Sequence, residues 1–160
     1  MNKAICTVSV AAIRAEPSHQ SEMTSQLLYG ETVDILESKG SFIKVKMHLD
    51  GYEGWTDARQ ISDISEEYFL ERKTELVLNP IQMYNTSQGA ILLSMGSEVN
   101  SENIKPTFLN FENISETAKQ FLNVPYLWSG RSFFGIDCSG FVQLIYKVHG
   151  ISLPREAQQQ

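Results

Sequence analysis

Cys138 stands in the run Asp137-Cys138-Ser139-Gly140, directly before a stretch with apolar residues at helical spacing. A cysteine that opens a helix lies beside unpaired backbone N–H groups and the positive end of the helix dipole, which favour the attacking thiolate. Ser139 and Gly140 are small, so they leave the sulfur accessible and place amide donors near a developing oxyanion. Free cysteine is also among the most buried residue types. Position alone is therefore equally consistent with a nucleophile and with a structural core cysteine.

A nucleophilic thiol needs a base that takes its proton and returns it to the leaving group. The sequence contains three histidines, and none of them suits this role. His19 and His48 lie in a predicted loop and at an outward strand position. His149 follows Cys138 on the same predicted helix, roughly 16 Å along its axis at 1.5 Å per residue. We therefore predict a nucleophile without its base in this chain.

The elements before the cysteine begin with a β-rich segment, residues 1–62. Residues 43–49 alternate between apolar and polar side chains, the period-two pattern of a half-buried strand. Asp50-Gly51 follows, and Gly accepts the positive φ that a tight hairpin turn requires. Short strands at this spacing indicate a small barrel.

The middle of the chain is predicted to join this segment to a second β unit. Residues 63–75 have the pattern of a short helix or helical turn. Residues 90–99 echo residues 25–33, because both place an apolar pair before Gly, a polar residue and Val. The repeat is weak, and it predicts a reduced second β unit over residues 76–110.

From residue 112 the pattern becomes helical. Ser115 is the predicted N-cap of a helix that stops at Pro125. A loop leads to Cys138, where a second helix with a broad apolar face begins and ends at Gly150. No strand is predicted after Val148, so we expect the apolar face of this helix to need a partner from outside the chain.

Composition excludes several classes of protein. The chain has 160 residues, a 42% hydrophobic fraction and a formal net charge of −6. These values suit a folded soluble protein and argue against a nucleic-acid partner. No stretch approaches the roughly 20 apolar residues that span a membrane. With only Cys6 and Cys138 present, both are predicted to be free thiols.

The N-terminus admits two interpretations. Its apolar run reaches only to Ile13, includes Ser, Thr and Cys, and is followed by Arg14. We favour a first strand over a weak signal peptide. The expected location is cytoplasmic if this N-terminus is native, and periplasmic or in the cell envelope if a leader has been removed.

Three segments near the C-terminus resemble the NlpC/p-sixty family of papain-like cell-wall cysteine peptidases: residues 126–130 (YLWSG), 135–143 (GIDCSGFVQ) and 153–155 (LPR). They occur in the family's order and spacing. One departure is Ser129, where the family usually has Gly. The resemblance implies that Cys138 is the nucleophile, and that its base is a strand-borne His downstream.

The first 62 residues resemble the bacterial SH3 domain that often precedes such catalytic domains, through residues 14–17 (RAEP) and 51–55 (GYEGW). The predicted fold is therefore α+β, with a small β-barrel SH3-like domain followed by the N-terminal helical part of a papain-like domain. We predict an SH3-like domain at 1–62 and a connector with a reduced second SH3-like unit at 63–111. The partial NlpC-type domain takes 112–160.

Family members with this arrangement hydrolyse the bond between γ-D-glutamate and a diamino acid in peptidoglycan stem peptides, and the SH3 domain favours a free N-terminal L-alanine. The resemblance implies such a peptide or muropeptide as partner, and neither cofactor nor metal. It implies that Asp137 pairs with the substrate ammonium, Trp128 walls the pocket and Ser139 bonds the peptide backbone. Tyr52 matches as a cleft residue, and Glu22 more loosely as an acidic partner.

Three functions stay open. The first is an enzyme fragment from murein turnover: a truncated or proteolysed chain, or a split or degenerate gene, with no peptidase activity alone. The second is a non-catalytic module that binds cell-wall peptide. The third is a papain-like acyltransferase or amidase. Trp128, Asp137 and an SH3 tyrosine favour a peptide with a free amine over a lipid acyl group, which counts against the third.

Overall fold

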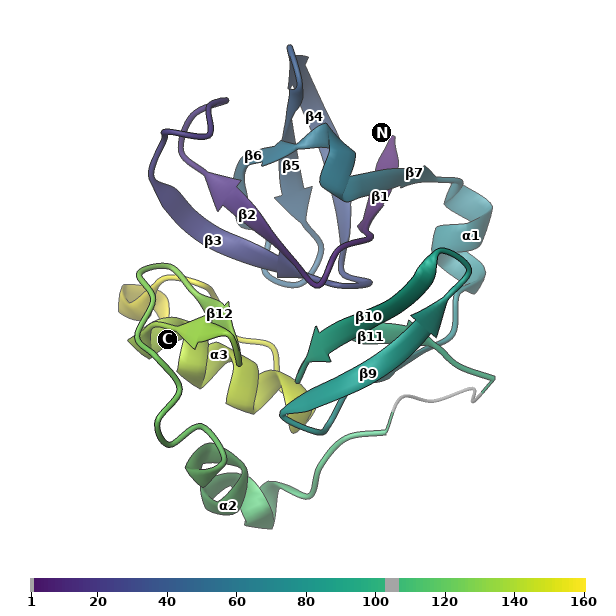
Figure 1. Cartoon of the computed structure of the whole chain (residues 1–160). Coiled ribbons are helices and arrows are strands. Elements are labelled where there is room, and N and C mark those ends of the chain that lie inside the picture. The colour runs from purple at the N-terminus through teal and green to yellow at the C-terminus, as the bar shows by residue number, and fades with distance from the viewer. Residues whose placement is uncertain (1, 103–106) are drawn as a thin grey trace.

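Strands dominate the first part of the computed structural model, which describes residues 2–102 and 107–160 (Figure 1). Seven of them form one antiparallel sheet in the order β3-β2-β6-β5-β4-β1-β7. They are β1 (Lys3–Cys6), β2 (Val10–Arg14), β3 (Met23–Leu28), β4 (Thr32–Lys39), β5 (Phe42–Met47), β6 (Glu53–Asp57) and β7 (Ile61–Ile64), with a 3-10 turn at Ala58–Gln60. The all-β prediction for this segment is confirmed.

The sheet is curled but open. Its two end strands, β3 and β7, are not neighbours in the hydrogen-bonded order of the described residues. Yet Leu27 of β3 and Ile61 of β7 belong to one buried cluster, which also holds Val45 and Met47 of β5. Side chains from both ends share one core because the sheet bends around it. The prediction of a small barrel is therefore corrected: the strands form an open sheet that curves around its core.

The predicted hairpin forms between β5 and β6. Val45 and Met47 are buried, whereas Lys46 between them is exposed, as the alternation requires. In the turn, the Asp50 carboxylate accepts a hydrogen bond from the Tyr52 amide at 2.9 Å. This bond holds Tyr52 at the mouth of the turn, where it enters the site described below.

The middle segment begins with the predicted short helix, α1 (Glu66–Glu71), which Ser65 caps. Four strands follow in two antiparallel pairs. They are β8 (Thr74–Leu76) with β11 (Glu98–Asn100), and β9 (Ile81–Thr86) with β10 (Gly89–Ser94). Whether residues 63–111 are an SH3-like unit stays a prediction.

The two weakly repeated segments meet each other. Each runs from a strand through a turn into the next strand, with Gly30 at φ +81° and Gly96 at φ +85° in the turns. The Glu98 amide donates to the Tyr29 carbonyl at 2.8 Å. A Cβ on Gly30 would lie 1.9 Å from the Glu98 carbonyl oxygen, so only Gly allows this approach. The contact joins the first sheet to the middle segment.

The first helix of the C-terminal part starts earlier than predicted. After a 3-10 turn at Phe111–Asn113, α2 runs over Ile114–Lys119 with Asn113 as N-cap, so the predicted cap Ser115 lies inside the first turn. The helix ends at Lys119, and a turn that includes Asn123 at φ 69° follows before Pro125. The Ser115 prediction is wrong because the preceding 3-10 turn already sets the helical direction.

The cysteine helix, α3, runs over Cys138–Val148 as predicted, and Gly150 at φ +82° lies just beyond its end. Two short strands, β12 (Arg131–Ser132) and β13 (Gly135–Ile136), precede it, and a 3-10 turn at Ala157–Gln159 ends the chain. Within the described residues, no helix combines the length and apolarity needed to cross a membrane.

Much of the apolar face of α3 finds its partners inside the chain. Leu144 and Val148 are fully buried, in a cluster with Leu28 of β3 and Met95 of the middle segment. Figure 1 shows α3 below β3, with the β9–β10 hairpin beside it. The expectation that this face needs a partner from outside is therefore wrong for these positions. They pack three segments into one core.

Candidate active site

A pocket of about 270 Å³ opens around Cys138, and residues from three parts of the chain line it. All six side chains predicted from the sequence are among them: Glu22, Tyr52, Trp128, Asp137, Cys138 and Ser139. Arg155 and Glu156 from the C-terminal loop complete the charged lining. The structure therefore brings the predicted residues together, whereas their individual roles stay predictions.

Cys138 occupies the first position of α3, and it is exposed while its neighbours on both sides are buried. The Asp137 carboxylate accepts the Gly140 amide at 2.6 Å, which caps the helix. Gly140 is required at this position, since a Cβ there would lie 2.2 Å from the Gly130 carbonyl oxygen. Local geometry thus presents the sulfur at the positive end of an eleven-residue helix.

Arg155 is the last residue of the segment 153–155 (LPR), and the sequence alone assigns it no role. Its guanidinium is buried and donates to Asp137 Oδ2 at 2.7 Å, to Ser139 Oγ at 2.7 Å and to Ser25 Oγ at 3.2 Å. Asp137 and Ser139 therefore have a partner within the chain. Arg155 also links the C-terminal loop to β3, which carries Ser25.

Trp128 crosses from the C-terminal part to the first sheet. Its indole Nε1 donates to Glu22 Oε1 at 2.9 Å, across 106 positions of sequence. Ser129 beside it holds φ 62°, a left-handed conformation that a non-glycine residue adopts at a cost. The backbone at Ser129 therefore carries local strain.

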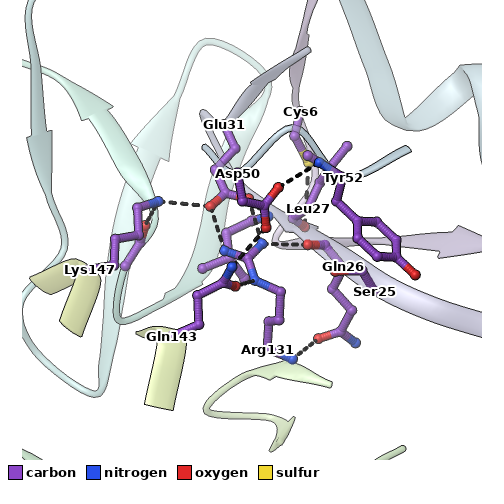
Figure 2. A network of polar contacts seen from close by, with 12 residues as sticks. Cys6, Ser25, Gln26, Leu27, Glu31, Asp50, Tyr52, Arg131, Gln143 and Lys147 are labelled. Carbon is purple, nitrogen blue, oxygen red and sulfur yellow. Dashed lines mark hydrogen bonds and ion pairs between the residues drawn. The ribbon is translucent and has the colours of Figure 1, made fainter. Parts of the chain in front are cut away.

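The structure also contains a buried ionic network that sequence reasoning missed (Figure 2). Glu31, before β4, pairs with Arg131 at 2.9 Å and with Lys147 of α3 at 2.8 Å. Lys147 also reaches Glu98 at 3.2 Å. Burial by itself raises the pKa of Glu31, but the charges of Arg131 and Lys147 outweigh it and hold the pKa at about 2.

Charged residues in a sequence indicate surface, so nothing local marked these three as buried. The one available signal was Lys147 within the apolar stretch of α3, next to Val148. Arg131 is fully buried, and the nearby negative charge of Glu31 outweighs desolvation and raises its pKa above the usual value. The network unites the first sheet, the middle segment and α3, and so sets where Cys138 lies relative to Tyr52 and Glu22.

The histidines lie elsewhere, and none lines the pocket among the described residues. His149 is buried, with its ring nitrogens 3.1 Å from the Leu109 carbonyl and 3.1 Å from Thr117 Oγ1. His48 contacts Thr32, and His19 contacts Asp57. Each imidazole ring therefore contacts residues that lie outside the lining of the Cys138 pocket.

Both cysteines are free, as predicted from the sequence. Cys6 lies in the core of the curled sheet, where burial raises the pKa of its thiol to about 12. Cys138, by contrast, lines two cavities. An apolar groove of about 340 Å³, which shares Tyr126, Asp137 and Cys138 with the pocket, is also lined by Phe121, Leu122 and Phe141.

Comparison with known proteins identifies the two ends of the chain. Residues 13–61 match the model of the bacterial dipeptidyl-peptidase SH3 domain, and residues 123–160 match the model of the NlpC/P60 family. A γ-D-glutamyl-L-lysine dipeptidyl-peptidase of Bacillus cereus is 30% identical over 184 residues, which cover 89% of this chain. This chain spans only 55% of that relative's length.

Further relatives agree. A Bacillus subtilis protein of the same name is 53% identical over 49 residues, covering 31% of this chain and 17% of its own. The crystal structure of an NlpC/P60 family protein from Bacillus cereus has a TM-score of 0.85 at 22% identity, covering 99% of this chain and 76% of that one. Together, the two matched segments and these relatives fit an NlpC/P60 family peptidase with an N-terminal SH3 domain.

Proposed function

We propose that this chain supplies the nucleophile and part of the substrate pocket of a cell-wall cysteine peptidase. The proposed substrate is a peptidoglycan stem peptide or muropeptide, cleaved between γ-D-glutamate and the diamino acid. The observation that carries the proposal is one pocket in which Glu22 and Tyr52 of the SH3 domain face Cys138. Two relatives named γ-D-glutamyl-L-lysine dipeptidyl-peptidases support the same bond.

The proposed chemistry is acyl transfer. The Cys138 thiolate attacks the γ-glutamyl carbonyl carbon, and amides of the first turn of α3 stabilise the resulting oxyanion. The leaving amine needs a proton, and no histidine of the described residues lines the pocket to give it. Water then cleaves the thioester to release the dipeptide. We propose that this chain supplies the nucleophile and that the histidine that donates the proton is not among the described residues of the pocket.

The charges of the pocket favour a substrate with a free amine. The Asp137 carboxylate already forms an ion pair with Arg155 within the chain, so its charge is compensated without a ligand. Glu22 accepts its bond from the neutral indole of Trp128, which leaves the negative charge of Glu22 uncompensated by that contact. A substrate ammonium would compensate this charge. We therefore assign the amine of an N-terminal L-alanine to Glu22, with Asp137 nearby.

Glu22→Gln is expected to weaken binding of L-Ala-γ-D-Glu-L-Lys by about tenfold, because the charge-assisted bond becomes neutral. The N-acetylated peptide should bind the variant and the parent alike. Calorimetry on both peptides measures the two dissociation constants. Glu67→Gln is the matched control, since it removes an equal charge from exposed α1. Equal losses for the free and acetylated peptides would contradict the assignment.

A second candidate function is peptide binding without cleavage. It is favoured because no histidine is among the described residues that line the pocket. Incubating the purified chain with L-Ala-γ-D-Glu-L-Lys and following the dipeptide by mass spectrometry separates the two functions. We expect binding without release. Release that is abolished by Cys138→Ala would show a base within this chain, and absence of binding would overturn the proposal for the pocket.

A further inference from the structure

We infer that Gln143 is a positioning residue that holds opposite walls of the Cys138 pocket at a fixed separation. Its relevance to substrate rests on the proposed function, whereas its structural effect can be measured without any ligand. Gln143 lies on α3, one turn and a half after the cysteine, and is 1% exposed. It does not line the pocket itself.

The amide group of Gln143 bonds three separate parts of the chain, of which Asp50 and Arg131 are labelled in Figure 2. Its Nε2 donates to Asp50 Oδ2 at 2.7 Å and to the Leu153 carbonyl at 2.9 Å. Its Oε1 accepts from Arg131 Nε at 2.6 Å. A primary amide has two N–H donors, and both are directed to a named acceptor.

Two of these partners lead directly to the pocket. Asp50 uses its other oxygen to accept the amide of Tyr52, which lines the SH3 wall. Leu153 lies two residues before Arg155, which lines the opposite wall and bonds Asp137. Gln143 therefore connects a turn of the SH3 domain to the loop that carries the guanidinium, and it does so beside the direct bond from Arg155 to Ser25 of β3.

The third partner, Arg131, is held in place by contacts of its own. Arg131 is fully buried and also bonds Glu31 at 2.9 Å and the Gln26 carbonyl at 2.5 Å. These contacts fix the orientation of the Arg131 guanidinium independently of Gln143. Gln143 therefore joins this buried, fixed side chain to the Asp50 turn and to the loop at Leu153.

The chemistry of the position requires a neutral amide. A glutamate in place of Gln143 has the same shape and still accepts from Arg131, but it cannot donate to the Leu153 carbonyl. It also places a carboxylate against that of Asp50, and like charges at this distance repel. A positive side chain in the same place would repel Arg131. Only a group that donates twice and accepts once satisfies all three contacts.

The test uses Gln143→Glu, Asp50→Asn and the double variant in the full chain. In the double variant, the side-chain amide introduced by Asp50→Asn donates to the carboxylate introduced by Gln143→Glu, so the polarity of the bond is reversed. The carbonyl oxygen of that new amide still accepts the Tyr52 backbone amide. The total charge equals that of the parent. The Leu153 contact stays lost, so the double variant restores the SH3 arm alone.

Amide hydrogen exchange at Tyr52 is the readout that needs no ligand. We expect at least about tenfold faster exchange in Gln143→Glu, and recovery in the double variant. Thermal unfolding checks that each variant folds. The alkylation rate of Cys138 should change less than twofold, because the inference concerns the walls and not the thiol. Unchanged Tyr52 exchange in folded Gln143→Glu would overturn the inference.

Peptide affinity connects this effect to function. Binding of L-Ala-γ-D-Glu-L-Lys should weaken about tenfold in Gln143→Glu and recover in part in the double variant. If the parent binds and Gln143→Glu binds equally well, the positioning role is refuted while the proposed function stands. If the parent itself does not bind, the proposed function fails, and Tyr52 exchange still decides the structural inference.

Discussion

Glu31→Gln is expected to lower the free energy of unfolding by about 3–5 kcal/mol, enough to unfold a marginal domain. Glu31 is 2% exposed and balances Arg131 and Lys147, which are 0% and 6% exposed at their side chains. Gln matches the shape but leaves two buried cations without an anion at that position. Urea unfolding followed by circular dichroism measures the difference.

Glu116→Gln is the matched control for this variant. Glu116 also accepts from a lysine, Lys119, at 2.6 Å, but both side chains are more than half exposed. The same chemical change there should cost less than about 0.5 kcal/mol. Equal effects of the two substitutions would show that the buried network contributes no more than a surface pair.

The contribution of Glu31 should also depend on pH. Its folded pKa of about 2 lies below the ordinary value of 4.5, so the folded state holds the proton less tightly than the unfolded state. The resulting stability is present above the unfolded pKa and is lost as pH falls from about 4.5 to about 2. The stability difference between the parent and Glu31→Gln should therefore shrink over this interval. A constant difference would contradict the depressed pKa.

Arg155→Met is expected to cost about 3 kcal/mol of stability and to slow alkylation of Cys138 at neutral pH. Met keeps much of the volume but leaves the Asp137 carboxylate without its cation and Ser139 without its donor. Loss of the Arg155 charge leaves the pocket one unit more negative, which disfavours a thiolate there. Urea unfolding and the rate of iodoacetamide labelling measure the two effects.

Lys44→Met is the control, because Lys44 and Glu53 form a pair at 3.5 Å with both side chains more than a third exposed. This substitution should change stability by less than about 1 kcal/mol and leave labelling of Cys138 unaltered. Unaltered labelling in Arg155→Met would show that the guanidinium serves the loop and has no influence on the sulfur.

Features that depend on neighbouring residues could be predicted from the sequence. The cysteine helix needs a capping Asp137, an apolar face and a terminal Gly150, and all of these lie within one short segment. The hairpin at Asp50 is equally local. The convergence of the six site residues was predictable only through family resemblance, since Glu22 and Trp128 are 106 positions apart.

Features that depend on long-range pairing were missed. Glu31 finds Arg131 and Lys147 at separations of 100 and 116 residues, and a single sequence offers no pattern that pairs them. Each alone indicates a solvated side chain. Closure of the barrel was also beyond local reasoning, because alternation predicts strands but not whether the first and last strands of a sheet pair.

The division of the buried charges between segments has a consequence for how the chain assembles as it is synthesised. Glu31 leaves the ribosome about 100 residues before Arg131, in the turn between β3 and β4, and Leu28 at the end of β3 also lacks its partners at that stage. Until its partners arrive, its carboxylate keeps its water, and an apolar surface that covers it prematurely would have to strip that water without compensation. Arg131 and Lys147 compensate that cost in the folded chain. We therefore expect the ionic network to disfavour docking of a segment without matching cations against Glu31.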